Sequence, residues 1–298
     1  MKAVNLGSMN IDYVYRMDQF IRPGETKACE ILTKGCGGKG LNQSIAMAQA
    51  GVDTCHAGII GAEGEFLREK LAEKGVDTRF VRVGEGANGH AIIQVNDAGQ
   101  NCIILYGGTN RQFSEAYIDD VLSEFESGDI VVLQNEINNI PYIIERAYEK
   151  GLRVAFNAAP YDDSILAYPL DKVEWLIVNE VEGGALSGES DPGAIADKLL
   201  ALYPRTKLML TLGKDGCLYA DSTQRVQMGA CTVEAVDTTA AGDTFIGYFI
   251  KGMTENLSIE QALRLATVAS AIAVTRPGAA DSVPAYEEVI HSPLLEAL

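Results

Sequence analysis

Five short runs of apolar residues recur along the chain, and they constrain the fold more than any other feature of the sequence. The runs span residues 3–6, 130–133, 153–156, 175–178 and 207–210. Each is almost continuously apolar, instead of alternating apolar with polar residues. This pattern is typical of strands that are buried on both faces of a parallel sheet. We therefore expect a parallel sheet at the centre of the fold.

Amphipathic stretches with helical periodicity lie between these runs, at residues 65–74, 114–126, 140–150 and 195–202. Each stretch ends near a Gly or a Pro, as helices commonly do. Because strand and helix patterns alternate, we predict an α/β fold, a three-layer α/β/α sandwich with a mostly parallel central sheet and right-handed crossovers.

Two segments break this alternation. Residues 89–107 indicate a β-hairpin with a turn at residues 96–99, and residues 11–34 contain two extended runs around residues 22–24. Strand pairs without a helix between them do not belong in a sheet covered by helices on both faces. We predict one domain, residues 1–298, whose lid is a small separate β-sheet formed by residues 11–34 and 89–107.

The composition narrows the choice of partners and compartment. The net charge is −17 and the isoelectric point is about 4.6, so the surface repels nucleic acid and anionic membranes. The six cysteines form no C-x-x-C pair, which indicates reduced thiols in a cytosolic protein. The start of the chain has no signal-peptide pattern, and the longest apolar stretch, residues 265–274, is shorter than the roughly 20 residues that span a bilayer. We expect a cytoplasmic protein with no nucleic-acid or membrane partner.

A glycine-rich loop, residues 35–43, precedes a helical pattern. Gly35, Gly37 and Gly40 spell G-x-G-x-x-G, which raises the alternative of an NAD-dependent oxidoreductase. That fingerprint normally follows the first strand of a βαβ unit, however, and this loop follows the predicted lid strands. It is not a Walker A loop either. Lys39 and Asn42 would suit a neutral, polyhydroxylated ligand, although a tight strand-to-helix turn explains the loop equally well.

A second loop, residues 237–245, carries small residues followed by Asp243 and the helical run 245–253. The small side chains leave the N–H groups of Ala241, Gly242 and Asp243 bare at a helix N-terminus, where they would bind a phosphoryl group. A lone Asp there usually only caps the helix. The functional alternative is that Asp243 accepts a hydroxyl proton beside the bound anion. A weak base suffices for phosphoryl transfer, which depends mainly on positioning.

Other polar residues follow the predicted strands. Because the carboxyl ends of parallel strands meet at one edge of a sheet, these residues would converge on one crevice. The isolated His56, His90 and His291, and the absence of G-x-S-x-G and H-E-x-x-H motifs, give no support to a hydrolase triad or a zinc site. The residues that follow strands are Asn10, Asp12, Glu136, Asn179, Glu182, Thr211, Gly213 and Gly216.

Together the two loops resemble the signatures of the ribokinase branch of the phosphofructokinase-B (PfkB) family of carbohydrate kinases. Residues 37–43, Gly-Gly-Lys-Gly-Leu-Asn-Gln, match the N-terminal signature, and residues 237–249 match D-T-x-A-A-G-D-x-F-x-G-x-F. The resemblance covers nearly the whole chain. It implies a ribokinase-like fold and ATP-dependent transfer to the primary hydroxyl of a pentose, with D-ribose as the leading substrate. Fructokinase, deoxyribokinase and nucleoside kinase activity are alternatives within the family. A further alternative is a sugar-binding protein with the kinase fold but no catalytic activity.

The resemblance also implies roles for individual residues, together with the cofactors ATP, Mg²⁺ and K⁺ and a homodimer formed through the β lid. Cys36 and residues 107–110 depart from the family pattern and leave the identity of the sugar open. The implied roles are Asp243 as the base; Ala240, Ala241 and Gly242 as the anion hole; Asn10, Asp12, Gly38, Lys39, Asn42 and Glu136 for the sugar; Asn179, Thr211, Gly213, Gly216 and Thr267 for ATP; Glu182 for Mg²⁺; and Asp237, Thr239, Ala273, Arg276, Gly278 and Ser282 for a monovalent cation.

Overall fold

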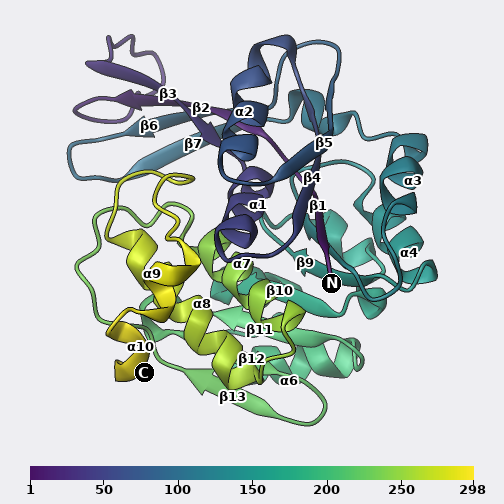
Figure 1. Cartoon of the computed structure of the whole chain (residues 1–298). Helices are drawn as coiled ribbons and strands as arrows, with labels where there is room; N and C mark the ends of the chain where they lie inside the picture. Colours follow the sequence, from purple (N-terminus) through teal and green to yellow (C-terminus); the bar gives the residue numbers. More distant parts are fainter.

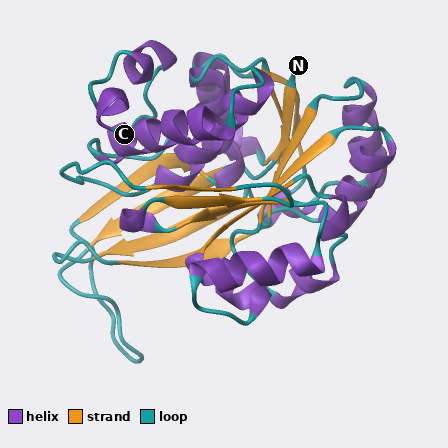
Figure 2. Ribbon diagram, turned by 90° about the horizontal axis from the view of Figure 1, so that it is seen from below, coloured by secondary structure: helices purple, strands orange, loops and turns teal.

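The computed structural model describes all 298 residues and centres on a nine-stranded sheet with helices on both faces (Figures 1 and 2). The strand order is β13-β12-β11-β10-β9-β8-β1-β4-β5. Neighbouring strands are parallel except around β12, which runs antiparallel to β11 and β13. The predicted three-layer α/β/α sandwich is therefore confirmed. The strands are β1 (Ala3–Leu6), β4 (Thr54–Ile60), β5 (Asp77–Val83), β8 (Ile130–Gln134), β9 (Arg153–Asn157), β10 (Trp175–Asn179), β11 (Lys207–Thr211), β12 (Cys217–Ala220) and β13 (Arg225–Met228).

The helices form two layers around two hydrophobic cores. Alternate residues of one strand enter different cores: Ile130 and Val132 of β8 pack on one face, and Val131 and Leu133 pack on the other. This double burial explains why the central strands are almost continuously apolar. The first core includes α1 (Lys39–Gln49), α2 (Glu65–Glu73), α7 (Ala241–Thr254), α8 (Ile259–Val274) and α9 (Tyr286–Ile290), with α10 (Leu294–Ala297) at its edge; the second includes α3 (Glu115–Ser123), α4 (Ile140–Glu149), α5 (Glu180–Ser187) and α6 (Pro192–Leu202). Five single-turn 3₁₀ helices span Ala62–Gly64, Gly108–Arg111, Asp163–Ala167, Leu170–Lys172 and Gly213–Asp215.

Helix boundaries follow capping residues more closely than they follow apolar periodicity. Ser114 caps α3 by accepting a hydrogen bond from the Tyr117 N–H at 3.2 Å. Helix α6 begins at Pro192, three residues earlier than predicted, because Asp191 caps it. Helix α7 begins at Ala241 instead of residue 245, so that Asp243 lies in its first turn.

The two predicted lid segments form one four-stranded sheet in the order β3-β2-β6-β7, which projects from one end of the central sheet (Figure 1). Strands β6 (His90–Val95) and β7 (Asn101–Tyr106) are the predicted hairpin. Strands β2 (Asn10–Arg16) and β3 (Ile31–Gly37) pair antiparallel, and β2 pairs with β6 in parallel. The lid thus joins two chain segments that lie far apart in the sequence.

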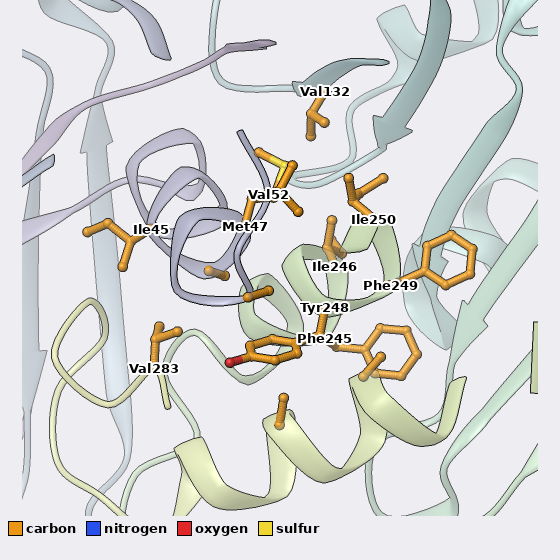
Figure 3. Packing of buried hydrophobic residues seen from close by; sticks show 14 of the residues in the cluster. Ile45, Met47, Val52, Val132, Phe245, Ile246, Tyr248, Phe249, Ile250 and Val283 are labelled. Atoms are coloured by element: carbon orange, nitrogen blue, oxygen red, sulfur yellow. The ribbon is translucent and has the colours of Figure 1, made fainter. Parts of the chain in front are cut away.

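Helices α1 and α7 pack side by side in the first core. Figure 3 shows Ile45 and Met47 of α1 in one cluster with Ile246 and Phe249 of α7. The first turns of both helices lie at the carboxyl edge of the sheet, near the ends of β1 and β8. The strand order reverses at this point, which is where open α/β sheets bind ligands. None of the helices has the length and apolar content needed to cross a lipid bilayer.

Candidate active site

A cavity of about 420 Å³ lies at this edge of the sheet, between the first turns of α1 and α7. It brings together residues from both sequence motifs and from the ends of β10 and β11. Polar and charged groups line much of it, which suits a hydrophilic ligand. Its lining includes Lys39, Asn179, Glu182, Thr211, Gly213, Thr238, Ala240, Ala241, Gly242 and Asp243.

Asp243 is buried in the wall of this cavity, with 7% of its surface exposed. Its Oδ2 accepts a hydrogen bond from Asn42 Nδ2 at 3.1 Å, and its Oδ1 accepts one from Gln43 Nε2 at 2.9 Å. The N-cap of α7 is Ala240, and no side chain caps the helix. The interpretation of Asp243 as a mere cap is therefore wrong, because its carboxylate bonds only to side chains of α1.

Backbone N–H groups at the start of α7 line the cavity next to Asp243. Ala240 has a left-handed conformation, with φ of 60°, and the N–H groups of Ala240, Gly242 and Asp243 have no hydrogen-bond acceptor. The expectation that the Ala241 N–H is also bare is wrong, since it donates to the Thr238 carbonyl at 3.3 Å. The remaining groups, at the positive end of the helix dipole, can bind an anion.

Two carboxyl groups that influence each other, those of Glu136 and Asp12, lie at the base of the lid. Glu136 Oε2 accepts hydrogen bonds from the Lys39 N–H at 3.0 Å and from the Ser8 hydroxyl. Burial raises the pKa of Glu136, against the opposing effect of the Lys39 charge. Burial raises the pKa of Asp12 to about 7, and the charge of Glu136 adds to this. Such carboxyl groups gain from hydrogen bonds to an incoming polar ligand.

The ammonium group of Lys39 balances the acidic groups of the site. Burial acts to lower the pKa of Lys39, but the carboxylates of Asp243, Glu136 and Glu182 raise it above its ordinary value. Lys39 therefore remains cationic at neutral pH.

Asn10 lies at the start of β2 and is nearly fully buried. Its Oδ1 accepts a hydrogen bond from Asn110 Nδ2 at 2.7 Å, and Asn110 Oδ1 accepts one from the Met9 N–H at 3.0 Å. These bonds orient the Asn10 amide so that its NH₂ group can still donate to a ligand. Asn110 is not predictable from a motif, because it lies in residues 107–110, which differ from the family pattern.

Asn179 and Glu182 form a capping box at the start of α5. Asn179 Oδ1 accepts from the Glu182 N–H at 2.9 Å, and Glu182 Oε2 accepts from the Asn179 N–H at 3.0 Å. Burial raises the pKa of Glu182. No group of three or more His, Cys, Asp or Glu side chains could hold a metal ion directly. The residues present would suit a Mg²⁺ ion that takes most of its ligands from nucleotide phosphates and water.

A second cavity of about 370 Å³ adjoins the first and shares Thr211, Gly213, Ala241 and Gly242 with it. Its other walls include apolar side chains from α7 and α8, which suits a flat aromatic base. Gly216 is required by its turn: its φ is 95°, and a Cβ would lie 2.0 Å from the Met228 carbonyl oxygen. The structure brings together all the predicted ATP residues, since Thr211, Gly213, Gly216 and Thr267 line this cavity and Asn179 lines the first.

Asp237 links the two segments predicted to hold a monovalent cation. Its Oδ1 accepts from the Thr239 N–H and its Oδ2 from the Gly278 N–H, both at 2.9 Å. Burial acts to raise the pKa of Asp237, but these hydrogen bonds lower it overall. Arg276 pairs with Glu288, so its guanidinium is engaged elsewhere. Ala273 lies in the last turn of α8, where its carbonyl accepts the Arg276 N–H at 3.1 Å, and Ser282 lies in the segment after this helix.

Comparison with known proteins agrees with this geometry. The profile of the pfkB family carbohydrate kinases matches residues 2–286. The chain belongs to this family. A Staphylococcus aureus ribokinase is 35% identical over 304 residues, covering 97% of this chain and 98% of the relative. Two solved structures illustrate the similarity of the fold. A Thermotoga maritima ribokinase has a TM-score of 0.87, 33% identity and coverage of 99% of both chains. An Arabidopsis thaliana ribokinase complexed with ribose and ATP has a TM-score of 0.86, 27% identity and coverage of 99% of this chain and 98% of the other.

The NAD-dependent oxidoreductase alternative finds no support in this pfkB kinase. The expected loop at residues 35–43 is wrong: Gly35 and Gly37 belong to β3 of the lid and Gly40 to the first turn of α1, so the three glycines do not follow the first strand of the parallel sheet. The carboxylate of Asp12 also packs directly against Gly37, where a dinucleotide fingerprint needs space for a pyrophosphate.

Proposed function

We propose that the chain transfers the γ-phosphoryl group of Mg²⁺·ATP to the primary hydroxyl of D-ribose, giving ribose 5-phosphate and ADP. The observation that carries this proposal is the position of Asp243. Its carboxylate lies beside bare N–H groups of α7, at the wall of a cavity that continues into a second one with apolar walls. Three features thus lie next to one another: a carboxylate that can accept a hydroxyl proton, N–H groups that can bind a phosphoryl group, and an apolar cavity that suits the adenine of ATP.

The sugar would lie between the lid base and Asp243. Asp12 and Glu136 can accept hydrogen bonds from ring hydroxyls, and Lys39 and Asn10 can donate to them. Gly38 brings the backbone close, because it has a positive φ of 92° and no side chain. Asn42 would act beside the sugar by holding Asp243, whose Oδ2 accepts a hydrogen bond from Asn42 Nδ2 at 3.1 Å.

The transfer step is an in-line displacement. Asp243 accepts the proton of the sugar hydroxyl as the bond from its oxygen to the γ-phosphorus forms. The bond from phosphorus to the β-phosphate oxygen breaks, and its electron pair stays on ADP. The N–H groups of Ala240 and Gly242 stabilise the charge on the transferring group. When bound, Mg²⁺ would supply positive charge that offsets the charge of the phosphates, and Glu182 would help to hold it indirectly.

Asp237 supports the further proposal that K⁺ activates the enzyme. Its ionised carboxylate joins the loop before α7 to the segment after α8, next to the N–H groups that would bind the phosphoryl group. A cation bound by Asp237 and nearby backbone carbonyls, including those of Thr239, Ala273 and Gly278, would add positive potential there.

The lid supports the proposal of a homodimer. Its edge strand β7 exposes four consecutive large apolar side chains, each at least 50% exposed: Ile103, Ile104, Leu105 and Tyr106. An unpaired edge of this kind is unfavourable in water, and burial against a second lid would cover it. The six free cysteines favour a reducing compartment such as the cytoplasm.

A coupled assay of ADP release tests the proposed function. Purified protein with Mg²⁺·ATP is given D-ribose, 2-deoxyribose, fructose or a nucleoside, with and without K⁺. The proposal predicts the highest kcat/KM with ribose and a further increase with K⁺. An equal or higher kcat/KM with another acceptor would show that ribose is not the preferred substrate. No ADP release from folded protein with any acceptor would overturn the proposal as a whole.

A further inference from the structure

We propose that Gln43 is a positioning residue for Asp243, and that a chain of buried side-chain amides fixes its orientation; this inference rests on the proposed phosphoryl transfer. Gln43 belongs to the glycine-rich motif, but nothing in the motif gives it a role. Its Nε2 donates to Asp243 Oδ1 at 2.9 Å. Gln43 is fully buried, so it cannot contact a sugar in the cavity itself. Its effect on the reaction must pass through Asp243.

The amide chain begins behind Gln43, inside the protein. Gln43 Oε1 accepts a hydrogen bond from Gln134 Nε2 at 2.7 Å. Gln134 Nε2 also donates to Asn5 Oδ1 at 3.1 Å, and Asn5 Nδ2 donates to the Gly40 carbonyl at 2.8 Å. The chain therefore runs from α1 through β8 and β1, and returns to the first turn of α1.

The Gly40 carbonyl determines the direction of every bond in this chain. A backbone carbonyl can only accept, so Asn5 must turn its NH₂ group toward Gly40 and its oxygen toward Gln134. Gln134 must then present its NH₂ group, whose two protons go to Asn5 and to Gln43 Oε1. Gln43 is left with its own NH₂ group facing Asp243.

A second backbone carbonyl gives the same result from the other side. Asn157 Nδ2 donates to the Ile177 carbonyl at 3.1 Å, which turns Asn157 Oδ1 toward Gln43 Nε2, at 3.2 Å. The Gln43 NH₂ group thus has two acceptors, Asn157 Oδ1 and Asp243 Oδ1. Since Gln43, Gln134 and Asn5 are fully buried, no water competes for the donors of this chain.

Two consequences follow for Asp243. Its Oδ1 is occupied by a donor that the substrate cannot displace, which leaves Oδ2, shared with Asn42, for the sugar hydroxyl. A hydrogen bond to a charged group is also stronger than one between neutral groups, so it holds the Asp243 carboxylate in one rotamer. Loss of Gln43 should therefore affect the chemical step more than the binding of either substrate.

Gln43→Met tests this, because Met has a similar volume and no donor. We expect kcat for ribose to fall about 10–100-fold, with both KM values changed less than about 3-fold. Gln134→Met removes the donor that orients Gln43, one hydrogen bond further from Asp243. It should lower kcat about 3–10-fold and likewise leave both KM values nearly unchanged. The control is Gln49→Met, which removes an amide of the same helix that donates to the Lys74 carbonyl and not to Asp243. It should keep kcat within about 2-fold of wild type.

The outcomes separate this inference from the proposed function. Wild-type enzyme without turnover would overturn both. Wild-type turnover with an unchanged kcat in folded Gln43→Met would overturn the positioning role alone. A rise in ribose KM with constant kcat would also overturn it, because that result indicates a role in binding. If Gln43→Met does not fold, Gln134→Met decides the question by the same criteria.

Discussion

Gly247 of α7 lies so close to Ala46 of α1 that a Cβ at position 247 would be 2.4 Å from the Ala46 Cβ. The absence of a side chain at Gly247 lets the middle parts of α1 and α7 pack closely against each other. At one end Asn42 bonds to Asp243, and at the other Lys251 Nζ donates to the Gly51 carbonyl at 3.4 Å. The base and the glycine-rich motif are therefore carried by one rigid pair of helices.

Gly247→Ala should destabilise the protein and lower its activity. The new methyl group would also lie 2.6 Å from the Ala46 carbonyl carbon, so the helices must move apart. We expect a loss of about 1–3 kcal/mol, more than the helix-propensity gain of up to about 1 kcal/mol. Thermal unfolding measures this. Gly229→Ala is the control, since a Cβ there meets no atom within 4 Å. An unchanged Tm for Gly247→Ala would contradict the prediction.

Gly37→Ala should weaken sugar binding without affecting ATP. A Cβ at this position would lie 2.0 Å from Asp12 Oδ2, so the carboxylate must move from its present position. We expect the ribose KM to rise about 10-fold or more, with the ATP KM nearly constant. Gly35→Ala on the same strand is the matched control, because a Cβ there meets no atom within 4 Å. Equal ribose KM values for the two variants would show that Asp12 does not hold the sugar.

Asp12→Asn should stabilise the ligand-free protein at pH 8 but not at pH 4. The pKa of Asp12 is raised from 3.8 to about 7, so the unfolded chain releases this proton first. Ionised Asp12 therefore lowers the free energy of unfolding progressively as the pH rises from about 4 to 7. Above pH 7, Asp12→Asn should therefore raise the free energy of unfolding by about 1–3 kcal/mol. This is less than the full pKa shift implies, because the group is partly exposed.

Urea unfolding of wild type and Asp12→Asn across this pH range measures the difference. Asp18→Asn is a control of opposite sign, since a hydrogen bond from Lys27 lowers the pKa of that exposed lid carboxylate. Asp18→Asn should therefore give no gain in stability at pH 8. A constant difference between wild type and Asp12→Asn from pH 4 to pH 8 would exclude the raised pKa.

Ile104→Lys should convert the proposed homodimer to a monomer. Ile104 is 59% exposed on the edge strand β7, and a charge there would have to be buried in the dimer. Sedimentation equilibrium checks the mass. Leu166→Lys is the matched control, because Leu166 is 54% exposed outside the lid. A wild-type protein that sediments as a monomer would remove the basis for the lid interface.

The sequence predicted the central strands because burial on both faces makes them continuously apolar. It did not predict β4, β5, β12 or β13. Strand β4 is interrupted by His56 and Gly58, and β12 and β13 have only four residues each, too few to show a period. The lid was predicted because two strand pairs lack an intervening helix, but the parallel pairing of β2 with β6 depends on tertiary contacts that no local pattern records.

Residues of the candidate site were predictable where they lie in a motif. Asp243, Lys39 and Asn42 are of this kind. Gln134 and Asn157 are isolated polar residues at strand ends, and they meet Gln43 across 91 and 114 residues of sequence. No spacing rule connects such positions, so only the fold shows the amide chain behind the base.

The most direct test of the account is the turnover of Asp243→Asn with ribose and Mg²⁺·ATP. The substitution keeps the size of the side chain and its place in α7, but it removes the group that accepts the hydroxyl proton. We expect normal folding, near wild-type binding of ribose and ATP, and a kcat at least about 1,000-fold lower. A variant that folds, binds both substrates and retains the wild-type kcat would show that Asp243 is not the catalytic base.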